Sequence, residues 1–228
     1  MNDGSSGHAL RSGQLDRVCP LCGHDGARPI APIKGWRRSV CDRCGFLYAP
    51  QIRTASGASV IDGVPPLRPT GRHRQIRRLV TRLVGSAALT LGLQGPLPEP
   101  LEVETPVDAV VLDHVLDRVA DPRIVVREAV AALAPGGVLV VVVANRVDIR
   151  RFSSGWRRVS RWNPPHQVNF FTAKALRSML TDAGLDVVPF GARAMDRRDL
   201  RDLPRSALEA LGVHPFGLRM YGRRPTPT

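Results

Sequence analysis

The stretch that most constrains the fold runs from Val107 to Asn145 and has the pattern of a β-strand, a helix and a second strand. The first predicted strand, 107–112, is apolar at all positions but one and is rich in β-branched residues. The second, 138–144, is apolar throughout, which is typical of a strand covered on both faces. Such a βαβ unit predicts a parallel sheet, and parallel sheets bind ligands at the carboxyl ends of their strands.

The helix of this unit carries its own start and stop signals. Asp121 is expected to cap its N-terminus, and Pro122 fits the first helical position because the missing N–H would have no partner there. The run Pro135-Gly136-Gly137 is expected to end the helix and turn the chain. Residues at helical spacing predict one buried apolar face, made of Ile124, Val125, Ala129, Val130 and Leu133.

The cysteines give the strongest chemical signal. All four lie in two C-x-x-C pairs, Cys19 with Cys22 and Cys41 with Cys44, and each pair is followed by a glycine that lets the backbone fold tightly. Four thiolates at this spacing predict a closed tetrahedral Zn²⁺ site with a structural role. The alternative is a pair of disulfides or redox centres, which a reducing compartment disfavours.

The formal net charge of +13 comes almost entirely from arginine, since Lys34 and Lys174 are the only lysines. Such a charge favours contact with nucleic acid or another anionic substrate, but an arginine-rich composition is equally well explained by a GC-rich genome. No apolar run is long enough to span a bilayer, and the first residues lack the apolar centre of a signal peptide. A cytoplasmic location without membrane contact is therefore expected.

Composition and periodicity also suggest a division of the chain. The expected segments are a flexible tail (1–16), a zinc ribbon (17–49), a linker rich in Pro, Gly, Ser and Thr (50–70), an α/β domain (71–222) and a second tail (223–228).

Two further helices are predicted inside the α/β domain. The first spans about 71–88 and has an apolar stripe of Ile76, Leu79, Val80, Leu83, Val84 and Ala87. The second is capped by Thr172, runs through Ala183 and ends at Gly184. Its inward side chains are expected to be Leu176, Met179 and Leu180.

The segment 146–171 alternates arginines with aromatic residues. Such a segment can clamp nucleic acid by stacking, or it can cover a substrate at the edge of the sheet; its position directly after a central strand favours the cover. His166 within it is the candidate catalytic base, because an imidazole titrates near neutrality, with an orienting or packing role as the alternative.

Taken together, these motifs resemble class I S-adenosylmethionine-dependent methyltransferases of the small bacterial type with an N-terminal zinc ribbon. The resemblance is carried by CPLCG, CDRCG, VDAVVLDHVLDRVADP, LAPGGVLVVVVAN and PPHQVNFFTAKALRSMLTDAGLDVV. It implies a Rossmann-like α/β sheet that is parallel apart from an antiparallel last hairpin, here 185–190 and 216–222. It also implies S-adenosylmethionine as the methyl donor.

The same resemblance assigns Gly92 and Gly95 to the glycine-rich cofactor loop, and Asp113 and His114 to the pocket at a strand end. The loop departs from the family pattern, and only about a dozen residues follow it before Val107, where relatives have two more strands. We therefore expect an incomplete sheet, impaired cofactor binding and an inner strand that becomes an edge. The 71–88 helix, the ribbon, a homodimer partner or another protein chain is expected to cover that edge.

Two functions follow as expectations. One is methyl transfer from S-adenosylmethionine to a small molecule or RNA. The other is a non-catalytic scaffold that combines a zinc ribbon with a methyltransferase-like domain and binds a protein or nucleic acid.

Overall fold

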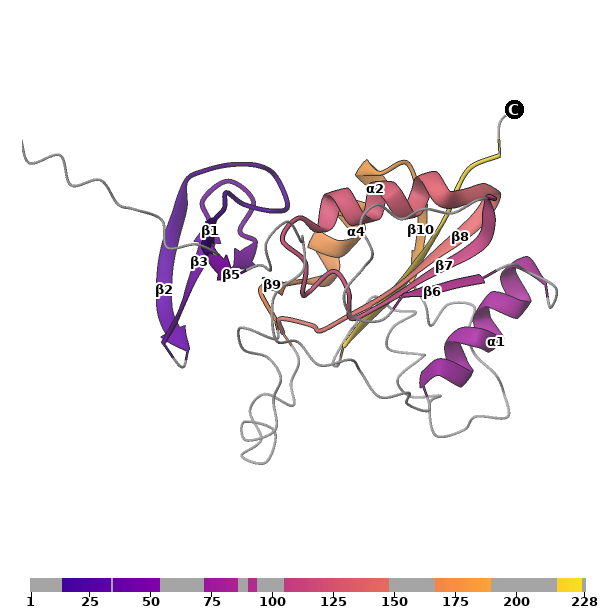
Figure 1. Cartoon of the computed structure of the whole chain (residues 1–228), viewed down its shortest axis with the longest axis horizontal. Coiled ribbons are helices and arrows are strands. Elements are labelled where there is room, and N and C mark those ends of the chain that lie inside the picture. The colour runs from indigo at the N-terminus through magenta and orange to yellow at the C-terminus, as the bar shows by residue number, and fades with distance from the viewer. Residues whose placement is uncertain are drawn as a thin grey trace, which may run out of the picture.

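The structure is a computed structural model of the 228-residue chain. It describes residues 14–33, 35–53, 72–85, 90–93, 105–147, 167–189 and 217–226. A mixed sheet has helices on both faces, and a small cysteine-bearing ribbon lies at one end of it (Figure 1), so the predicted fold class is confirmed. None of the described helices has the length and apolar character needed to cross a membrane.

The main sheet has five strands in the order β10-β11-β8-β7-β6. Their bounds are Thr90–Leu93 (β6), Val107–Asp113 (β7), Leu133–Val143 (β8), Asp186–Pro189 (β10) and Leu218–Arg223 (β11). β6, β7 and β8 run parallel, whereas β11 and β10 pair antiparallel. The expected last hairpin is therefore present, and among the described residues β6 forms one edge of the sheet, as the shortened sequence predicts.

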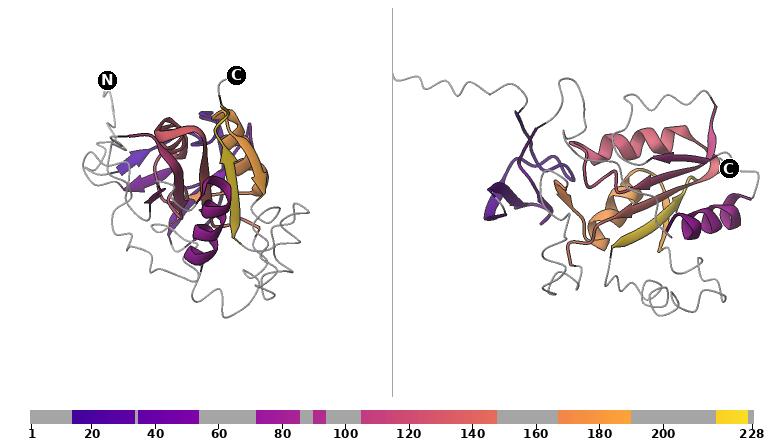
Figure 2. Two further views of the ribbon diagram at one scale, coloured as in Figure 1. Left: turned by 90° about the vertical axis from the view of Figure 1, so that its right-hand side faces the viewer. Right: turned by 60° about the horizontal axis from the view of Figure 1, so that its bottom comes forward.

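Helix α1 (Arg72–Val84) covers one face of the sheet (Figures 1 and 2). Its buried side chains Ile76, Leu79 and Val80 pack against Ala109, Val111, Val138, Val140, Val142 and Tyr221. The predicted stripe is confirmed from Ile76 to Val84, since Leu83 and Val84 are partly buried against the same cluster. The helix ends at Val84, before the predicted boundary, and Ala87 lies outside the described residues. Gly85 follows with a φ of 96°, a left-handed conformation that favours glycine after a helix end.

Helices α2 (Pro122–Ala132) and α4 (Ala173–Asp182) cover the opposite face. α2 begins as predicted: the Asp121 carboxylate accepts a hydrogen bond of 2.9 Å from the Arg123 N–H. Its predicted apolar face is wrong at Ile124, whose exposed fraction is 45%. The buried helical residues are Pro122, Val125, Val126 and Ala129.

The predicted turn at Pro135-Gly136-Gly137 is also wrong, because β8 already begins at Leu133. Leu133 is extended and fully buried, and the Arg224 guanidinium donates to its carbonyl oxygen and to that of Val130. The Pro-Gly-Gly run instead lies in a bulge of β8, where the register against β7 shifts. A Cβ on Gly137 would lie 2.9 Å from the Ala134 carbonyl oxygen, so the bulge requires glycine there.

Helix α4 has the predicted cap, with the Thr172 hydroxyl accepting a 3.2 Å hydrogen bond from the Ala175 N–H. We expect Thr172→Ala to lower the free energy of unfolding by about 1 kcal/mol, because that N–H loses its partner. Thr172→Ser keeps the hydroxyl and is the matched control. Urea unfolding should show a lower midpoint with an unchanged slope for the alanine variant alone. Equal midpoints for both variants would contradict the capping role.

The cysteine ribbon comprises strands β1 to β5. Their bounds are Gln14–Asp16 (β1), Ala27–Ile33 (β2), Trp36–Cys41 (β3), Leu47–Tyr48 (β4) and Gln51–Arg53 (β5). β1 pairs with β5, and the second sheet has the order β2-β3-β4-β9, in which β9 (Asn169–Phe170) directly precedes α4. The ribbon therefore completes its sheet with a strand from the far part of the chain.

This pairing places the ribbon at the carboxyl end of the central strands (Figure 2). Phe171 forms a β-bridge with Asn145, just after β8, and its ring packs edge-on against Phe46 of the ribbon with centroids 5.2 Å apart. Cys19, Cys41, Phe46 and Tyr48 are buried in the same core cluster as the residues of β7 and β8.

Candidate functional site

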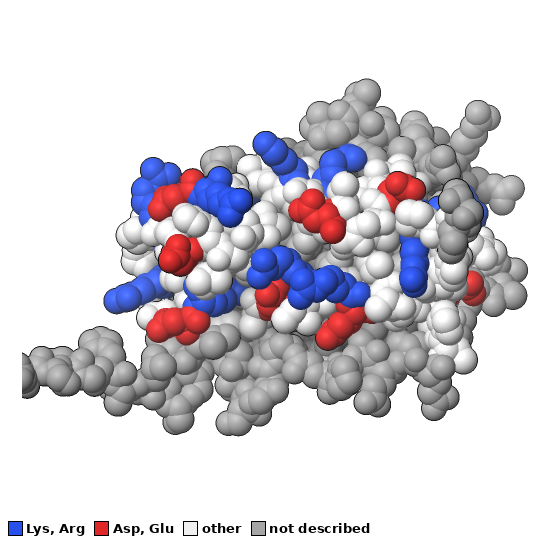
Figure 3. All heavy atoms as spheres, turned by 90° about the horizontal axis from the view of Figure 1, so that it is seen from above, with Lys and Arg blue, Asp and Glu red and all other residues white. Residues whose placement is uncertain are grey.

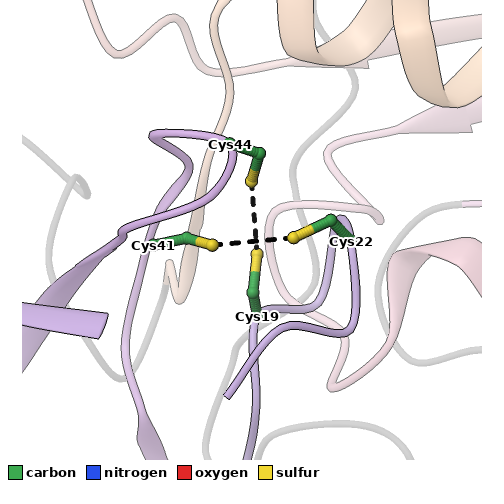
Figure 4. Close-up of side chains that lie close together, drawn as sticks. All are labelled: Cys19, Cys22, Cys41 and Cys44. Atoms are coloured by element: carbon green, nitrogen blue, oxygen red, sulfur yellow. Dashed lines mark hydrogen bonds between the residues drawn. The ribbon is translucent and has the colours of Figure 1, made fainter. Parts of the chain in front are cut away.

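The four cysteine sulfurs converge on one point (Figure 4). All four Sγ atoms lie within 4.8 Å of one another, with 3.6 Å between Cys19 and Cys44 and between Cys22 and Cys41. A disulfide would bring two sulfurs to about 2.05 Å. Four sulfurs bound about 2.3 Å from one zinc ion would be separated by about 3.8 Å. The cluster therefore fits a tetrahedral metal site and a zinc ribbon.

The two cysteine pairs occupy equivalent tight turns. The Gly23 N–H donates to the Cys19 carbonyl at 2.8 Å, and the Gly45 N–H donates to the Cys41 carbonyl at 2.9 Å. Gly23 has a φ of 73° and Gly45 a φ of 69°, a region that side chains disfavour. The two glycines thus have the conformational role expected from the sequence.

The electrostatics of the cluster differ from thiol to thiol. Burial raises the pKa of Cys41, but hydrogen bonds from the backbone N–H groups of Cys44 and Arg43 and with the Cys22 and Cys44 thiols together outweigh it and bring that pKa down to about 7. Burial raises the pKa of Cys44 to about 11 and that of Cys19 further. A Zn²⁺ ion bound at the centre of the cluster would be held by thiolates, since a coordinated thiol is deprotonated.

At the carboxyl edge of the sheet, the structure brings together three of the residues expected there. Gly92 lies on β6 in register with Val111, near the end of β7. Asp113 ends β7 and is buried, and His114 follows it. Gly95, His166 and most of the arginine-aromatic segment lie outside the described residues.

His114 is paired with a carboxylate that the sequence analysis did not single out. Its Nδ1 lies 2.9 Å from Oδ2 of Asp117, and the side chains are 20% and 4% exposed, respectively. Among the described residues, His114 is the one non-glycine residue with a positive φ, which is 56°. Its backbone N–H donates a hydrogen bond of 2.7 Å to the Val142 carbonyl. The sequence pattern that could have indicated this pair is a histidine directly after a predicted strand, followed three residues later by an aspartate.

Arg17 of the ribbon holds the loop that follows this pair. Its guanidinium donates to the carbonyl oxygens of Ala49, Ala120 and Val168 at 2.7, 2.7 and 2.8 Å. These three carbonyls belong to the ribbon, to the β7–α2 loop and to the segment before β9. Burial lowers the pKa of Arg17 to about 10, so the side chain remains charged at neutral pH.

Asn169 of β9 holds the same loop from another side. Its Nδ2 donates to the carbonyl oxygens of Leu116 and Val119, each at 2.8 Å. The Val168 N–H donates to the Asp117 carbonyl at 2.9 Å. The loop that carries the His114–Asp117 pair is thus bonded directly to the strand that completes the ribbon sheet.

The charged side chains on the face shown in Figure 3 are of both signs and interspersed. One resolved ion pair is Arg123 with Asp121, at 3.0 Å. A nucleic-acid interface is expected to present a basic patch or stripe, which this face does not.

Parallel strands, an antiparallel last hairpin and helices on both faces are features of the class I methyltransferase fold. Residues 54–189, more than half of the chain, match a family model described as a methyltransferase domain. The chain belongs to this methyltransferase family.

A curated relative is the ubiquinone biosynthesis O-methyltransferase of Caulobacter sp. (strain K31), with 28% identity over 155 residues. The match covers 64% of this chain and 58% of that protein, so the chain spans little more than half of its relative's length.

Solved structures with similarity include a SAM-dependent methyltransferase from Thermotoga maritima, at 13% identity and a TM-score of 0.39, covering 67% of this chain and 90% of that one. Another is an S-adenosylmethionine-dependent methyltransferase from Mesorhizobium loti, at 18% identity and a TM-score of 0.35, covering 54% and 65%.

Proposed function

We propose that this chain binds S-adenosylmethionine at the carboxyl edge of its sheet and transfers the methyl group to a small-molecule or RNA acceptor. The observation that carries the proposal is the family match together with the parallel pairing of β6 and β7, which brings Gly92 to the edge that carries Asp113 and His114. Parallel sheets bind ligands at this edge.

In this proposal Gly92 and Gly95 approach the methionine part of the donor, and Asp113 and His114 line the pocket. S-adenosylmethionine supplies an electrophilic methyl group on a sulfonium. The protein holds donor and acceptor in line and excludes water, which accounts for much of the catalysis in such reactions. His166 stays a candidate for the removal of a proton from the acceptor. Binding is expected to be impaired, because Thr90 and Gln94 stand where the family loop has an acid and a glycine.

Cys19, Cys22, Cys41 and Cys44 are proposed to hold one structural Zn²⁺. The separations of their sulfurs support this, and the closed set of four thiolates gives the metal no open position for catalysis. The metal would stabilise the ribbon that packs at the carboxyl edge.

A calorimetric titration with S-adenosylmethionine tests the proposal. We expect saturable heat with the wild-type chain and at least about tenfold weaker binding for Gly92→Arg, because the new side chain would occupy the donor's approach. Thr181→Arg adds the same side chain at an exposed position of α4 and is the matched control.

The second candidate is the non-catalytic scaffold, favoured by Thr90 and Gln94 standing where the family loop has an acid and a glycine. No heat at millimolar donor would contradict the enzyme and favour this scaffold. An RNA-binding scaffold should lose affinity steeply as salt is raised, and a flat salt dependence would exclude phosphate contacts as its basis.

A further inference from the structure

We propose that His114 is the general base of the methyl transfer and that Asp117 positions it. The acceptor is then a group that must lose a proton as it is methylated, namely a hydroxyl. This inference rests on the proposed function and deepens it, because it defines the class of acceptor.

The backbone at His114 is held in an uncommon conformation. A non-glycine residue with a φ of 56° is uncommon, and such residues occur often at functional sites. The His114 N–H is fixed on the Val142 carbonyl at 2.7 Å. The side chain reaches Asp117 three residues later. The ring thus stands where β7 and β8 end, at the edge proposed for the donor.

The carboxylate of Asp117 is fixed more firmly than the ring. Its side chain is 4% exposed, and Oδ2 also receives the Ala144 N–H at 3.4 Å. The Asp117 carbonyl accepts from the Val168 and Asn169 N–H groups, which anchors the backbone beneath the carboxylate. The more exposed member of the pair is therefore the imidazole.

This arrangement determines which ring nitrogen carries the proton. A buried carboxylate is only an acceptor, so in the neutral ring the proton sits on Nδ1 and the lone pair on Nε2 is left to accept another proton. In hydrolytic triads an aspartate fixes the tautomer and the orientation of the histidine in the same way.

In the proposed step the acceptor oxygen is methylated and its proton moves to His114. A lone pair of the acceptor oxygen attacks the methyl carbon, and the carbon–sulfur bond breaks with its electron pair going to sulfur, so the sulfonium becomes a neutral thioether. The hydroxyl proton moves to Nε2 of His114. The resulting imidazolium lies beside the Asp117 carboxylate, which stabilises it until the proton passes to solvent.

The first experiment reads the tautomer of His114 by long-range ¹H–¹⁵N NMR on the full-length chain, at a pH at which the ring is neutral. We expect a protonated Nδ1 and a bare Nε2. Asp117→Ala should remove this preference for Nδ1, because Nδ1 then loses its acceptor, whereas Asp182→Ala at an exposed site of α4 should not. A protonated Nε2 in the wild type, or the same tautomer in Asp117→Ala, would overturn the positioning role.

The second experiment measures methyl transfer from deuterium-labelled S-adenosylmethionine to a mixture of phenols, catechols and sugars, and to thiols that are already ionised. His114→Gln and Asp117→Ala should each lower transfer to the hydroxyls by about 100-fold relative to transfer to thiolates by the same variant, because only the hydroxyls need a base. Equal losses for hydroxyls and thiolates, or unchanged transfer to hydroxyls, would overturn the proposal. So would a wild-type chain that binds the donor and methylates no hydroxyl.

The two proposals fail in different ways. A wild-type chain that gives no heat with the donor contradicts the proposed function, whatever the tautomer of His114. A chain that binds the donor but has the wrong tautomer contradicts only the general base.

Discussion

Replacing Cys41 with serine is expected to abolish metal binding and unfold the cysteine ribbon. The change removes one of four converging sulfurs, and structural zinc contributes about 10–16 kcal/mol to the folding of small metal-bound domains at neutral pH. Cys41 is 1% exposed and shares a core cluster with Phe46 and Tyr48, so the loss should spread to the packing against the sheet.

Metal analysis and thermal unfolding measure this effect. Wild-type protein purified without a chelator should contain about one zinc per chain, and Cys41→Ser close to none. Arg43→Ser is the matched control, because Arg43 lies between Cys41 and Cys44 and contributes only its backbone N–H to the site. A wild type without zinc, or a Cys41→Ser variant with full zinc and an unchanged midpoint, would contradict the four-thiolate site.

Arg17→Met is expected to destabilise the chain strongly while leaving the cysteines intact. Methionine keeps much of the apolar stem but donates to none of the three carbonyls, of Ala49, Ala120 and Val168. The Val168 carbonyl keeps the Ala49 N–H as a donor at 2.9 Å, so the carbonyls of Ala49 and Ala120 are the ones that lose the Arg17 donor. A buried carbonyl without a partner costs about 1–3 kcal/mol, so we expect the free energy of unfolding to fall by about 4 kcal/mol. The thermal midpoint should fall by about 10 °C.

The exposed Arg28 of β2 provides the control, since Arg28→Met removes the same charge without a buried partner. Hydrogen exchange should accelerate across the β7–α2 loop in the Arg17 variant and not in the Arg28 variant. Equal midpoints for the two variants would show that the three carbonyls do not depend on Arg17.

The features that the sequence predicted correctly depend on short-range chemistry. Asp121 and Thr172 cap the helices that directly follow them, and Gly23 and Gly45 take the positive φ that their cysteine turns require. The parallel strands were recognisable because both of their faces are buried, which leaves continuous apolar runs. Asp113 and His114 could then be assigned to the carboxyl end of a strand from strand polarity, whereas Gly92 was assigned through the family resemblance.

The features that the sequence missed depend on partners far along the chain. The end of α2 is bonded to Arg224, more than ninety residues away, and the helix ends before the adjacent Pro-Gly-Gly run. The Arg17 guanidinium bonds to carbonyls 103 and 151 residues away, and nothing local distinguishes it from the many surface arginines. The role of Asp117 also depends on its burial, which the pattern of a polar loop does not predict.

The pairing of β4 with β9 also has a consequence for how the chain is made. Leu47 lies opposite Phe170 and Tyr48 opposite Asn169, so the ribbon sheet lacks its last strand until more than a hundred further residues have left the ribosome. At about 5–20 residues per second, this interval lasts roughly ten seconds. The two cysteine turns are local and can form at once, so a metal ion captured during synthesis would hold the early half of the ribbon together until its outer strand arrives.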